Sequence, residues 1–346
     1  MAETRFQFLP AEDRRDALRV AQEKGTYRAF LLEKDVWVVA TLRALFDAPF
    51  GRDLVFKGGT SLSKAYGVIQ RFSEDVDITY DIRAFAPDLV AGSGEEALPP
   101  TRSQEQRWTR AIRGRLAEWV EKETRPIIER SLAEGGFSAR VRAEAEELYV
   151  SYDPLFEDYA FIRPEVKVEF GARSTGEPRA VRRVWCDAAG FLPELLFPDA
   201  CPSVMLAERT FWEKATAVHV YCRQERRRGA RLSRHWHDLA RLDDAGVADR
   251  ACADRTLALS VARHKAMFFP EKDAAGARID YEAASSGGLQ LVPTGSTFDV
   301  LADDYGRMVA DGMLLGTVES FERLIERCAG IEARANRPED DSERAP

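Results

Sequence analysis

Hydrophobic residues recur at helical spacing near the N-terminus and change to a strand-like alternation after residue 50. The stretch "FLLEKDVWVVATLRALFDAP" predicts an amphipathic helix that ends at a proline, so we expect residues 1–49 to form an N-terminal helical segment. The apolar run "DLVF" predicts a strand, Gly58-Gly59 a turn, and the apolar spacing from Leu62 to Ile69 a helix. Next, "DVDITY" alternates acidic and apolar residues. The predicted order is strand, glycine turn, helix, strand.

A loop, a long helix and further strands are expected after this unit. Residues 84–104 are rich in Pro, Gly, Ser and Glu, as in a surface loop, and residues 105–134 have helical periodicity that Pro126 should kink or divide. The segments "LYVSY", "EVKVEF" and "RAVRRVWCD" have the composition of strands. We therefore expect an α/β core over residues 50–198 with a helical insertion at about 103–136.

From about residue 200 the periodicity is helical, as in "ERTFWEKATAVHVYC" and "FERLIERCAGIEA", which predicts an α-helical domain over residues 199–334. Residues 335–346, "ANRPEDDSERAP", are acidic, contain proline and are expected to be disordered. The predicted fold class is α+β, a mixed α/β core with a mixed sheet followed by a helical domain.

Charge and targeting signals restrict the functional classes. The formal net charge of −8 over 346 residues argues against a protein that coats DNA indiscriminately, because its surface would repel phosphates. The N-terminus "MAETRFQFLPAEDRR" has no signal-peptide pattern, and the early apolar run "VWVVATL" is far shorter than the roughly 20 residues that span a bilayer. We expect a cytoplasmic protein that does not associate with membranes.

The glycine turn is a candidate phosphate-binding site. Gly58 and Gly59 allow a ligand to approach the backbone closely, and the hydroxyls of Thr60 and Ser61 add donors. The alternative is a turn that only caps a helix. The sequence GxxxxGK of a Walker A loop does not occur here.

Asp75 and Asp77 are candidate metal ligands. On a strand, residues i and i+2 point to the same side with Cα atoms roughly 6 to 7 Å apart, so both carboxylates can reach one hard cation such as Mg²⁺. Such a pair is suited to phosphoryl or nucleotidyl transfer. Glu169 in "EVKVEF" joins them if its strand lies beside "DVDIT". The alternative is a solvated acidic strand face.

A basic segment is a candidate RNA contact. Residues 223–234, "RQERRRGARLSR", contain six arginines and one glutamate, a local net charge of +5. Such clusters bind RNA backbones, and arginine also stacks on unpaired bases. We name Arg226, Arg227, Arg228, Arg231 and Arg234 as candidates. A solvated loop is the alternative.

Several ordered motifs resemble one known family. "KGGTSLSKAYGVIQRFSEDVDI", "VKVEFGARS", "ERTFWEKATAVH", "RLSRHWHDLARL" and "DYGRM" together resemble the AbiEii/AbiGii-type nucleotidyltransferase toxins. These toxins of type IV toxin–antitoxin and abortive-infection systems belong to the DNA polymerase β-like nucleotidyltransferase superfamily. The resemblance extends from about residue 30 to 330 and implies a polymerase β-like core.

The resemblance also implies roles for individual residues. Gly58, Gly59 and Thr60 would hold a nucleoside triphosphate, and Ser61, Lys64 and Ser73 complete the expected nucleotide contacts. Asp75 and Asp77 would bind Mg²⁺, or alternatively Mn²⁺, with Glu169 as a third acid. Lys214 and Asp238 match further catalytic residues, and Ser73 matches a hydroxyl residue that some antitoxin kinases phosphorylate.

The function implied is a toxin that adds nucleotides to RNA, with the 3′ acceptor end of tRNA as the expected acceptor, and so blocks translation. A cognate antitoxin is the second expected partner. Two alternatives stay open: nucleotidylation of a protein or small molecule, and a catalytically silent RNA-binding module. The sequence does not select the nucleotide, the tRNA or the oligomeric state.

Overall fold

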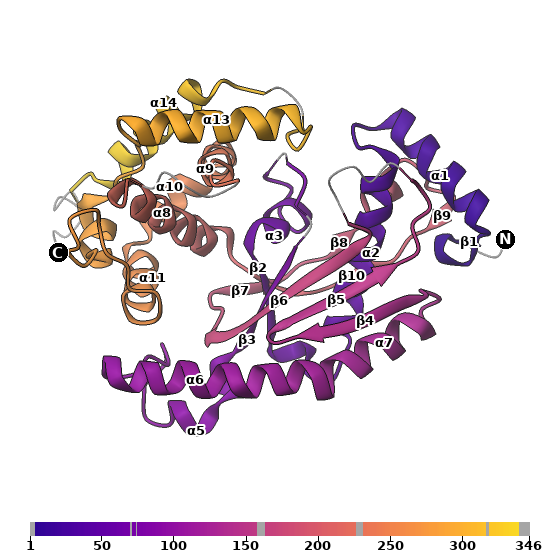
Figure 1. Cartoon of the computed structure of the whole chain (residues 1–346), viewed down its shortest axis with the longest axis horizontal. Helices are drawn as coiled ribbons and strands as arrows, with labels where there is room; N and C mark the ends of the chain where they lie inside the picture. Colours follow the sequence, from indigo (N-terminus) through magenta and orange to yellow (C-terminus); the bar gives the residue numbers. More distant parts are fainter. Residues whose placement is uncertain are drawn as a thin grey trace, which may run out of the picture. The chain divides into compact units, whose positions relative to one another are not determined.

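The structure, a computed structural model, describes residues 4–69, 71–73, 75–157, 163–225, 231–315 and 318–338. The chain divides into two compact units (Figure 1). The first comprises Met1–Gly67 and Ser73–Met205, and the second comprises Val68–Phe72 and Leu206–Pro346. The division after Met205 lies close to the boundary expected at residue 199. The short segment Val68–Phe72, which precedes Asp75, belongs to the helical unit.

A seven-stranded mixed sheet forms the centre of the first unit, in the order β4-β5-β6-β3-β2-β11-β7. The strands β3 and β6 are parallel, as are β2 and β11, and the other pairs are antiparallel. The bounds are β2 Leu54–Lys57, β3 Val76–Asp81, β4 Ala139–Glu144, β5 Glu147–Tyr152, β6 Glu165–Ser174, β7 Arg179–Val181 and β11 Ser203–Met205. Two small pairs accompany this sheet: β1 (Thr4–Arg5) with β9 (Leu195–Leu196), and β8 (Val184–Trp185) with β10 (Asp199–Ala200).

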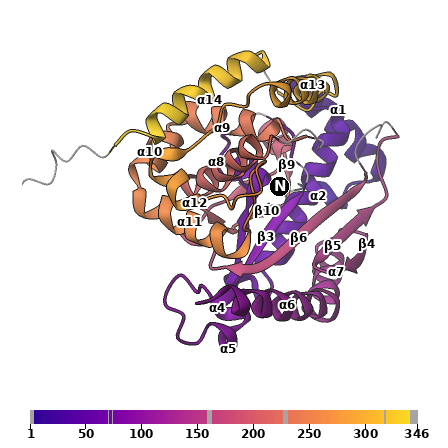
Figure 2. The ribbon, with the colours of Figure 1, turned by 60° about the vertical axis from the view of Figure 1, so that its left-hand side comes forward.

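Helices cover one face of this sheet. Figures 1 and 2 show α6 (Arg102–Trp119) and α7 (Arg125–Glu134) along it, joined by a π-helical turn, Val120–Thr124. Pro126 lies in the first turn of α7, directly after the π-helical turn, where its missing N–H interrupts the ladder of a continuous helical run. Trp119 packs edge-on against Phe170 of β6. Trp37 of α2 (Ala29–Phe46) stacks on Tyr152 of β5.

Alternation along the strands separates the two faces. In β6, Val166 and Val168 are fully buried, whereas Lys167 and Glu169, which alternate with them, are only half-buried. The remaining helices of the first unit are α1 (Ala11–Lys24), α3 (Gly58–Lys64), α4 (Ile82–Phe85) and α5 (Pro87–Val90). The expected order of strand, helix and strand is present. The helix, however, spans Gly58–Lys64 and not Leu62–Ile69, so it includes the two glycines expected to form a turn, and residues 84–104 include the short α5.

The second unit is helical in the described residues. Its helices are α8 (Ala207–Arg223), α9 (Arg234–Asp244), α10 (Val247–Ala253), α11 (Arg255–Phe268), α12 (Tyr281–Ala283), α13 (Ser296–Ala310) and α14 (Phe321–Ala335). Two buried tryptophans fix the packing by donating hydrogen bonds to backbone carbonyls: Trp212 to Ala251 at 2.9 Å and Trp236 to Leu291 at 2.7 Å. The expected α+β fold is confirmed by these elements and by the structural comparison below.

The end of the chain differs from expectation in its first residues. Ala335, where we expected the tail to begin, is still part of α14, and Asn336 exchanges two hydrogen bonds of 2.8 Å with the backbone of Leu289. Residues 339–346 lie outside the described part. Among the described helices, none has both the length and the apolar character required to cross a membrane.

Candidate active site

Gly58, the first residue of α3, directly follows β2 and lies against Asp77 at this strand-to-helix turn. Gly58 has a φ of +78°, a left-handed conformation that L side chains rarely adopt. A Cβ atom at this position would lie 2.1 Å from Oδ2 of Asp77, far inside van der Waals contact. Glycine is therefore required here for two independent reasons, its backbone angle and the proximity of a carboxylate. The register of β2 with β3, in which Lys57 is opposite Asp77, produces this proximity.

Two hydroxyl groups of α3 make hydrogen bonds to the backbone around the site. Thr60 Oγ1, almost fully buried, lies 2.5 Å from the carbonyl oxygen of Asp75 and 2.8 Å from Oγ of Ser73. Ser61, also buried, donates to the carbonyl of Gly58 at 2.9 Å. These contacts fix the backbone that leads to Asp75. The expected roles of Thr60, Ser61 and Ser73 in nucleotide binding, together with that of Gly59, stay predictions.

Acidic residues form a row across three strands. Asp77 of β3 is in register with Glu169 of β6, and Glu169 is in register with Glu147 of β5. The strand of Glu169 therefore lies beside "DVDIT", as its expected role next to Asp75 and Asp77 requires. Lys167 lies 2.5 Å from Glu169 and 2.8 Å from Glu147. This pairing holds the pKa of Glu147 below its ordinary value through hydrogen bonds from Lys167 and Tyr149.

We call this set of Asp77, Glu169, Glu147 and Lys167 the acidic row. Glu147 and Lys167 were not among the residues expected at the site. The alternation in "EVKVEF" places Lys167 on the same face as Glu169, and this signal was available. Glu147 is recognised only once the pairing of β5 with β6 is known.

Lys64 lies between two carboxylates. Its Nζ is 2.5 Å from Asp35 of α2 and 2.6 Å from Asp187, and its side chain is 8% exposed. Burial and the neighbouring charge of Asp187 raise the pKa of Asp35 to about 7. Burial alone would lower the pKa of Lys64, but the two carboxylates outweigh it and raise that pKa. Lys64 therefore has structural partners on both sides, and its contact with a nucleotide stays a prediction.

The second unit contains a buried cluster of Arg71, Lys214 and Asp238, which we call the cationic cluster. Arg71 makes a bidentate ion pair with Asp238 at 2.7 and 2.8 Å, and Lys214 Nζ lies 2.8 Å from the same carboxylate. Two cations share one anion, so the formal charge of the cluster is +1. All three residues are less than a tenth exposed. Since buried charges are costly unless paired, each depends on its neighbours.

Electrostatics in the cationic cluster follow from burial. Burial alone would raise the pKa of Asp238, but Arg71 and then Lys214 hold that pKa well below its ordinary value. Burial lowers the pKa of Lys214, and the charge of Asp238 opposes this effect. Arg71 was not expected at the site, because its partner Asp238 is 167 residues away and no spacing rule connects them.

The described part of the basic segment has structural contacts. The backbone N–H of Arg231 donates to Asp304 at 2.7 Å, and Arg234 is the first residue of α9. Arg226, Arg227 and Arg228 lie outside the described residues. The expectation that this segment binds RNA stays a prediction.

A comparison with known families shows to which family the chain belongs. The profile of the family described as "Nucleotidyl transferase AbiEii toxin, Type IV TA system" matches residues 40–327. The chain belongs to the AbiEii nucleotidyltransferase toxin family. Among solved structures, it is similar to MenT4, a nucleotidyltransferase toxin from Mycobacterium tuberculosis H37Rv, with a TM-score of 0.50 and 18% sequence identity. That match covers 97% of this chain and 92% of MenT4, and it supports the fold. A search of curated proteins returned no match.

The metal implied by the AbiEii family can be tested against the residues present. In the described part of the chain, no group of three or more His, Cys, Asp and Glu side chains is arranged to hold a metal by itself. Mg²⁺ does not require such a cage, because it usually binds through one or two carboxylates together with waters and substrate phosphates. The half-buried carboxylates of Asp75 and Asp77, with only oxygen donors, fit this requirement.

Proposed function

We propose that this AbiEii-family toxin transfers a nucleoside monophosphate from a nucleoside triphosphate to the 3′ acceptor end of tRNA, and so blocks translation. The observation that carries the proposal is the direct packing of Gly58 against the carboxylate of Asp77. A backbone held this close to a carboxylate allows one bound phosphate to reach both the turn and a metal at Asp77. A purely structural turn has no need of a carboxylate at this distance.

Each group has a separate task in this proposal. Asp75 and Asp77 would hold Mg²⁺, with Glu169 as a further candidate ligand. When bound, Mg²⁺ neutralises charge on the triphosphate. Thr60 holds the backbone carbonyl of Asp75 in place. The cationic cluster, with its formal charge of +1, is suited to an anionic phosphate, and Lys214 is assigned to that contact.

Membership in a type IV toxin–antitoxin family implies a cognate antitoxin. We propose Ser73 as a point at which such a partner can act. The Ser73 hydroxyl lies 2.8 Å from Thr60, which itself positions Asp75. A phosphate on Ser73 would break this contact and add about two negative charges beside the metal ligands. Binding of a triphosphate would then be opposed by charge repulsion.

The test uses the purified full chain, Mg²⁺, total tRNA and each α-labelled nucleoside triphosphate in turn, with the products separated on a denaturing gel. We expect label on RNA from one nucleotide, and loss of label with Asp75→Ala. Glu144→Gln is a matched control, because Glu144 is an exposed acid on β4 of the same sheet. Label on protein would favour nucleotidylation of a protein, and no label would favour a silent RNA-binding module. Label that persists in Asp75→Ala would refute the assigned metal site.

A further inference from the structure

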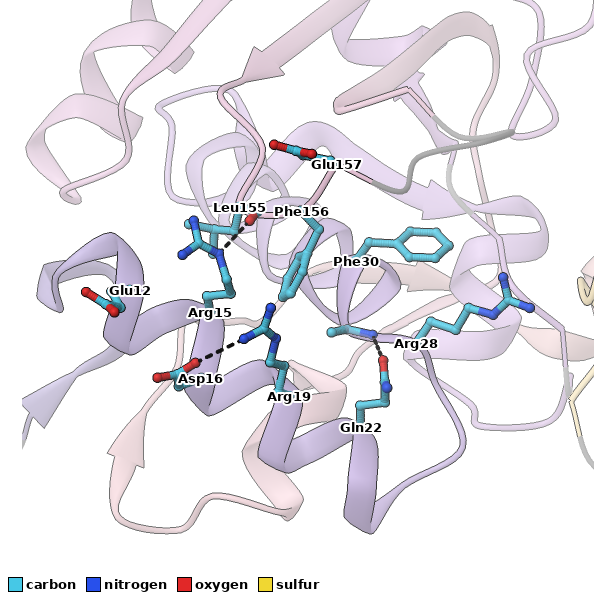
Figure 3. Close-up of a pocket in the computed structure, with 11 residues that line it drawn as sticks. Glu12, Arg15, Asp16, Arg19, Gln22, Arg28, Phe30, Leu155, Phe156 and Glu157 are labelled. Carbon is cyan, nitrogen blue, oxygen red and sulfur yellow. Dashed lines mark hydrogen bonds and ion pairs between the residues drawn. The ribbon is translucent and has the colours of Figure 1, made fainter.

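A cavity of about 820 Å³ lies within the first unit, between α1, the start of α2 and the segment that follows β5 (Figure 3). Its walls carry three arginines, Arg15, Arg19 and Arg28, and two phenylalanines, Phe30 and Phe156. None of the residues assigned above to the triphosphate, the metal or the cationic cluster lines this cavity. It is large enough for a small ligand and is a separate candidate site.

Guanidinium groups in the cavity are available for an anion. Arg15 is fixed to the wall, since its Nε donates to the carbonyl of Leu155 at 2.8 Å. Arg19 makes a long ion pair of 3.5 Å with Asp16. Within the part of the chain that the structure describes, the terminal nitrogens of Arg15 and the whole guanidinium of Arg28 have no hydrogen-bond or ion-pair partner. These donors suit a phosphate, which arginine binds with two parallel hydrogen bonds.

Aromatic side chains line the same space. Phe156 projects from its segment toward α1, and Phe30 extends from the start of α2 on the other side (Figure 3). Both rings are half-buried, so part of each remains accessible from the cavity. Aromatic rings beside arginines form the usual platform for an unstacked nucleobase.

The charge balance limits what the cavity can hold. Three carboxylates, those of Glu12, Asp16 and Glu157, balance the three arginines, so the formal charge of the lining is zero. A triphosphate, with several negative charges, would meet little net attraction here. A ligand with one phosphate, an aromatic base and hydroxyl groups matches better, because carboxylates accept hydrogen bonds from ribose hydroxyls.

We propose that this cavity binds one unpaired nucleotide of the acceptor RNA, with its base on Phe156 and its phosphate at Arg28. This inference rests on the proposed function, because it takes RNA as the acceptor. The cavity would be an RNA-binding site within the first unit, separate from the arginines of residues 223–234. A 2′-hydroxyl that reaches Glu157, the neighbour of Phe156, would favour RNA over DNA at this site.

Direct RNA binding tests the site. Fluorescence anisotropy with a labelled single-stranded RNA, in the absence of nucleoside triphosphate, should show about 5- to 150-fold weaker binding for Phe156→Ala, the loss expected for one base stacked on an aromatic ring. Arg28→Ala should reduce the slope of log affinity against log salt by about 1. Phe8→Ala and Arg52→Ala are matched controls, because Phe8 is 62% exposed and the Arg52 side chain 85% exposed, both away from the cavity.

Two outcomes separate this inference from the proposed function. If the wild-type protein labels RNA but Phe156→Ala and Arg28→Ala bind it normally, the cavity is not an RNA site and the proposed function stands. If the wild-type protein neither binds nor labels RNA, both fall. Should Phe156→Ala fail to fold, Phe156→Leu keeps an apolar side chain without a ring and is expected to show the same loss. The inference would also be overturned if Phe156→Ala and Arg28→Ala bound a protein partner more weakly but bound RNA as the wild type does.

Discussion

The acidic row of the first unit and the cationic cluster of the second have opposite charge balance. In the acidic row, one lysine pairs with two of the three carboxylates, those of Glu147 and Glu169, and the side chains are partly exposed. In the cationic cluster, two cations share the fully buried carboxylate of Asp238. An excess of carboxylate is suited to a cation, and an excess of cation to a phosphate. The difference in burial predicts that substitutions cost more stability in the cationic cluster than in the acidic row.

Removing Arg71 should give the largest loss of stability. Arg71→Met leaves the buried Asp238 with one cation fewer, and a broken buried pair of this kind costs about 3–5 kcal/mol of unfolding free energy. Arg115→Met is the matched control, since Arg115 makes a similar bidentate pair with Asp88 at the surface. That change should cost at most about 1 kcal/mol. Urea unfolding of both variants measures the difference, and equal losses would contradict the role assigned to burial.

Gly58→Ala should abolish most activity. A Cβ atom at Gly58 must displace the carboxylate of Asp77, and a shift of this size reduces transfer by about 100-fold. Gly92→Ala is a strict control, because Gly92 has a φ of +81° and open space around it. Both variants carry the strain of the backbone angle, but only Gly58→Ala should lose nucleotidyl transfer. Normal transfer by Gly58→Ala would refute the assignment of the turn.

Lys167→Met should lower the Mg²⁺ concentration that transfer requires, if the acidic row contributes to metal binding. Loss of the ammonium group leaves Glu169 and Glu147 without their cation, so a metal beside Asp77 meets more negative charge. The Mg²⁺ concentration for half-maximal transfer should fall by about 3- to 10-fold. Lys122→Met, which removes an exposed lysine paired with Glu118, should leave it unchanged. An unchanged Mg²⁺ requirement in Lys167→Met would place the metal away from Glu169.

The smallest effect expected is a pH dependence of stability from Asp35. The pKa of Asp35, raised to about 7, means that the native state keeps a proton that the unfolded chain loses near pH 4. Stability should therefore decrease as the pH rises from about 4 to 7. Asp187→Asn removes the like charge that helps to raise this pKa, and should weaken the dependence. Melting temperatures measured across this range test the prediction, and an unaltered profile would contradict it.

Local patterns predicted much of the fold and named the first residues of the candidate site. The alternation in "DVDITY" and the glycine pair located Asp77 and Gly58 because both signals lie within one strand and one turn. The partners of Lys64 and Arg71 could not be found in this way. Asp35 and Asp238 meet them only through tertiary packing, and buried ion pairs leave no periodic signal. The cavity beside Phe156 likewise depends on the packing of segments far apart in sequence.

The central claim is that Asp75 and Asp77 hold the divalent cation used in transfer. Titration of the full chain with Mn²⁺, followed by electron paramagnetic resonance in the presence of a non-hydrolysable nucleoside triphosphate, tests this most directly. We predict that the wild-type protein binds Mn²⁺ together with the nucleotide, and that Asp77→Asn weakens this binding by at least about tenfold while the fold is retained. Equal Mn²⁺ binding by the wild type and Asp77→Asn would contradict the account.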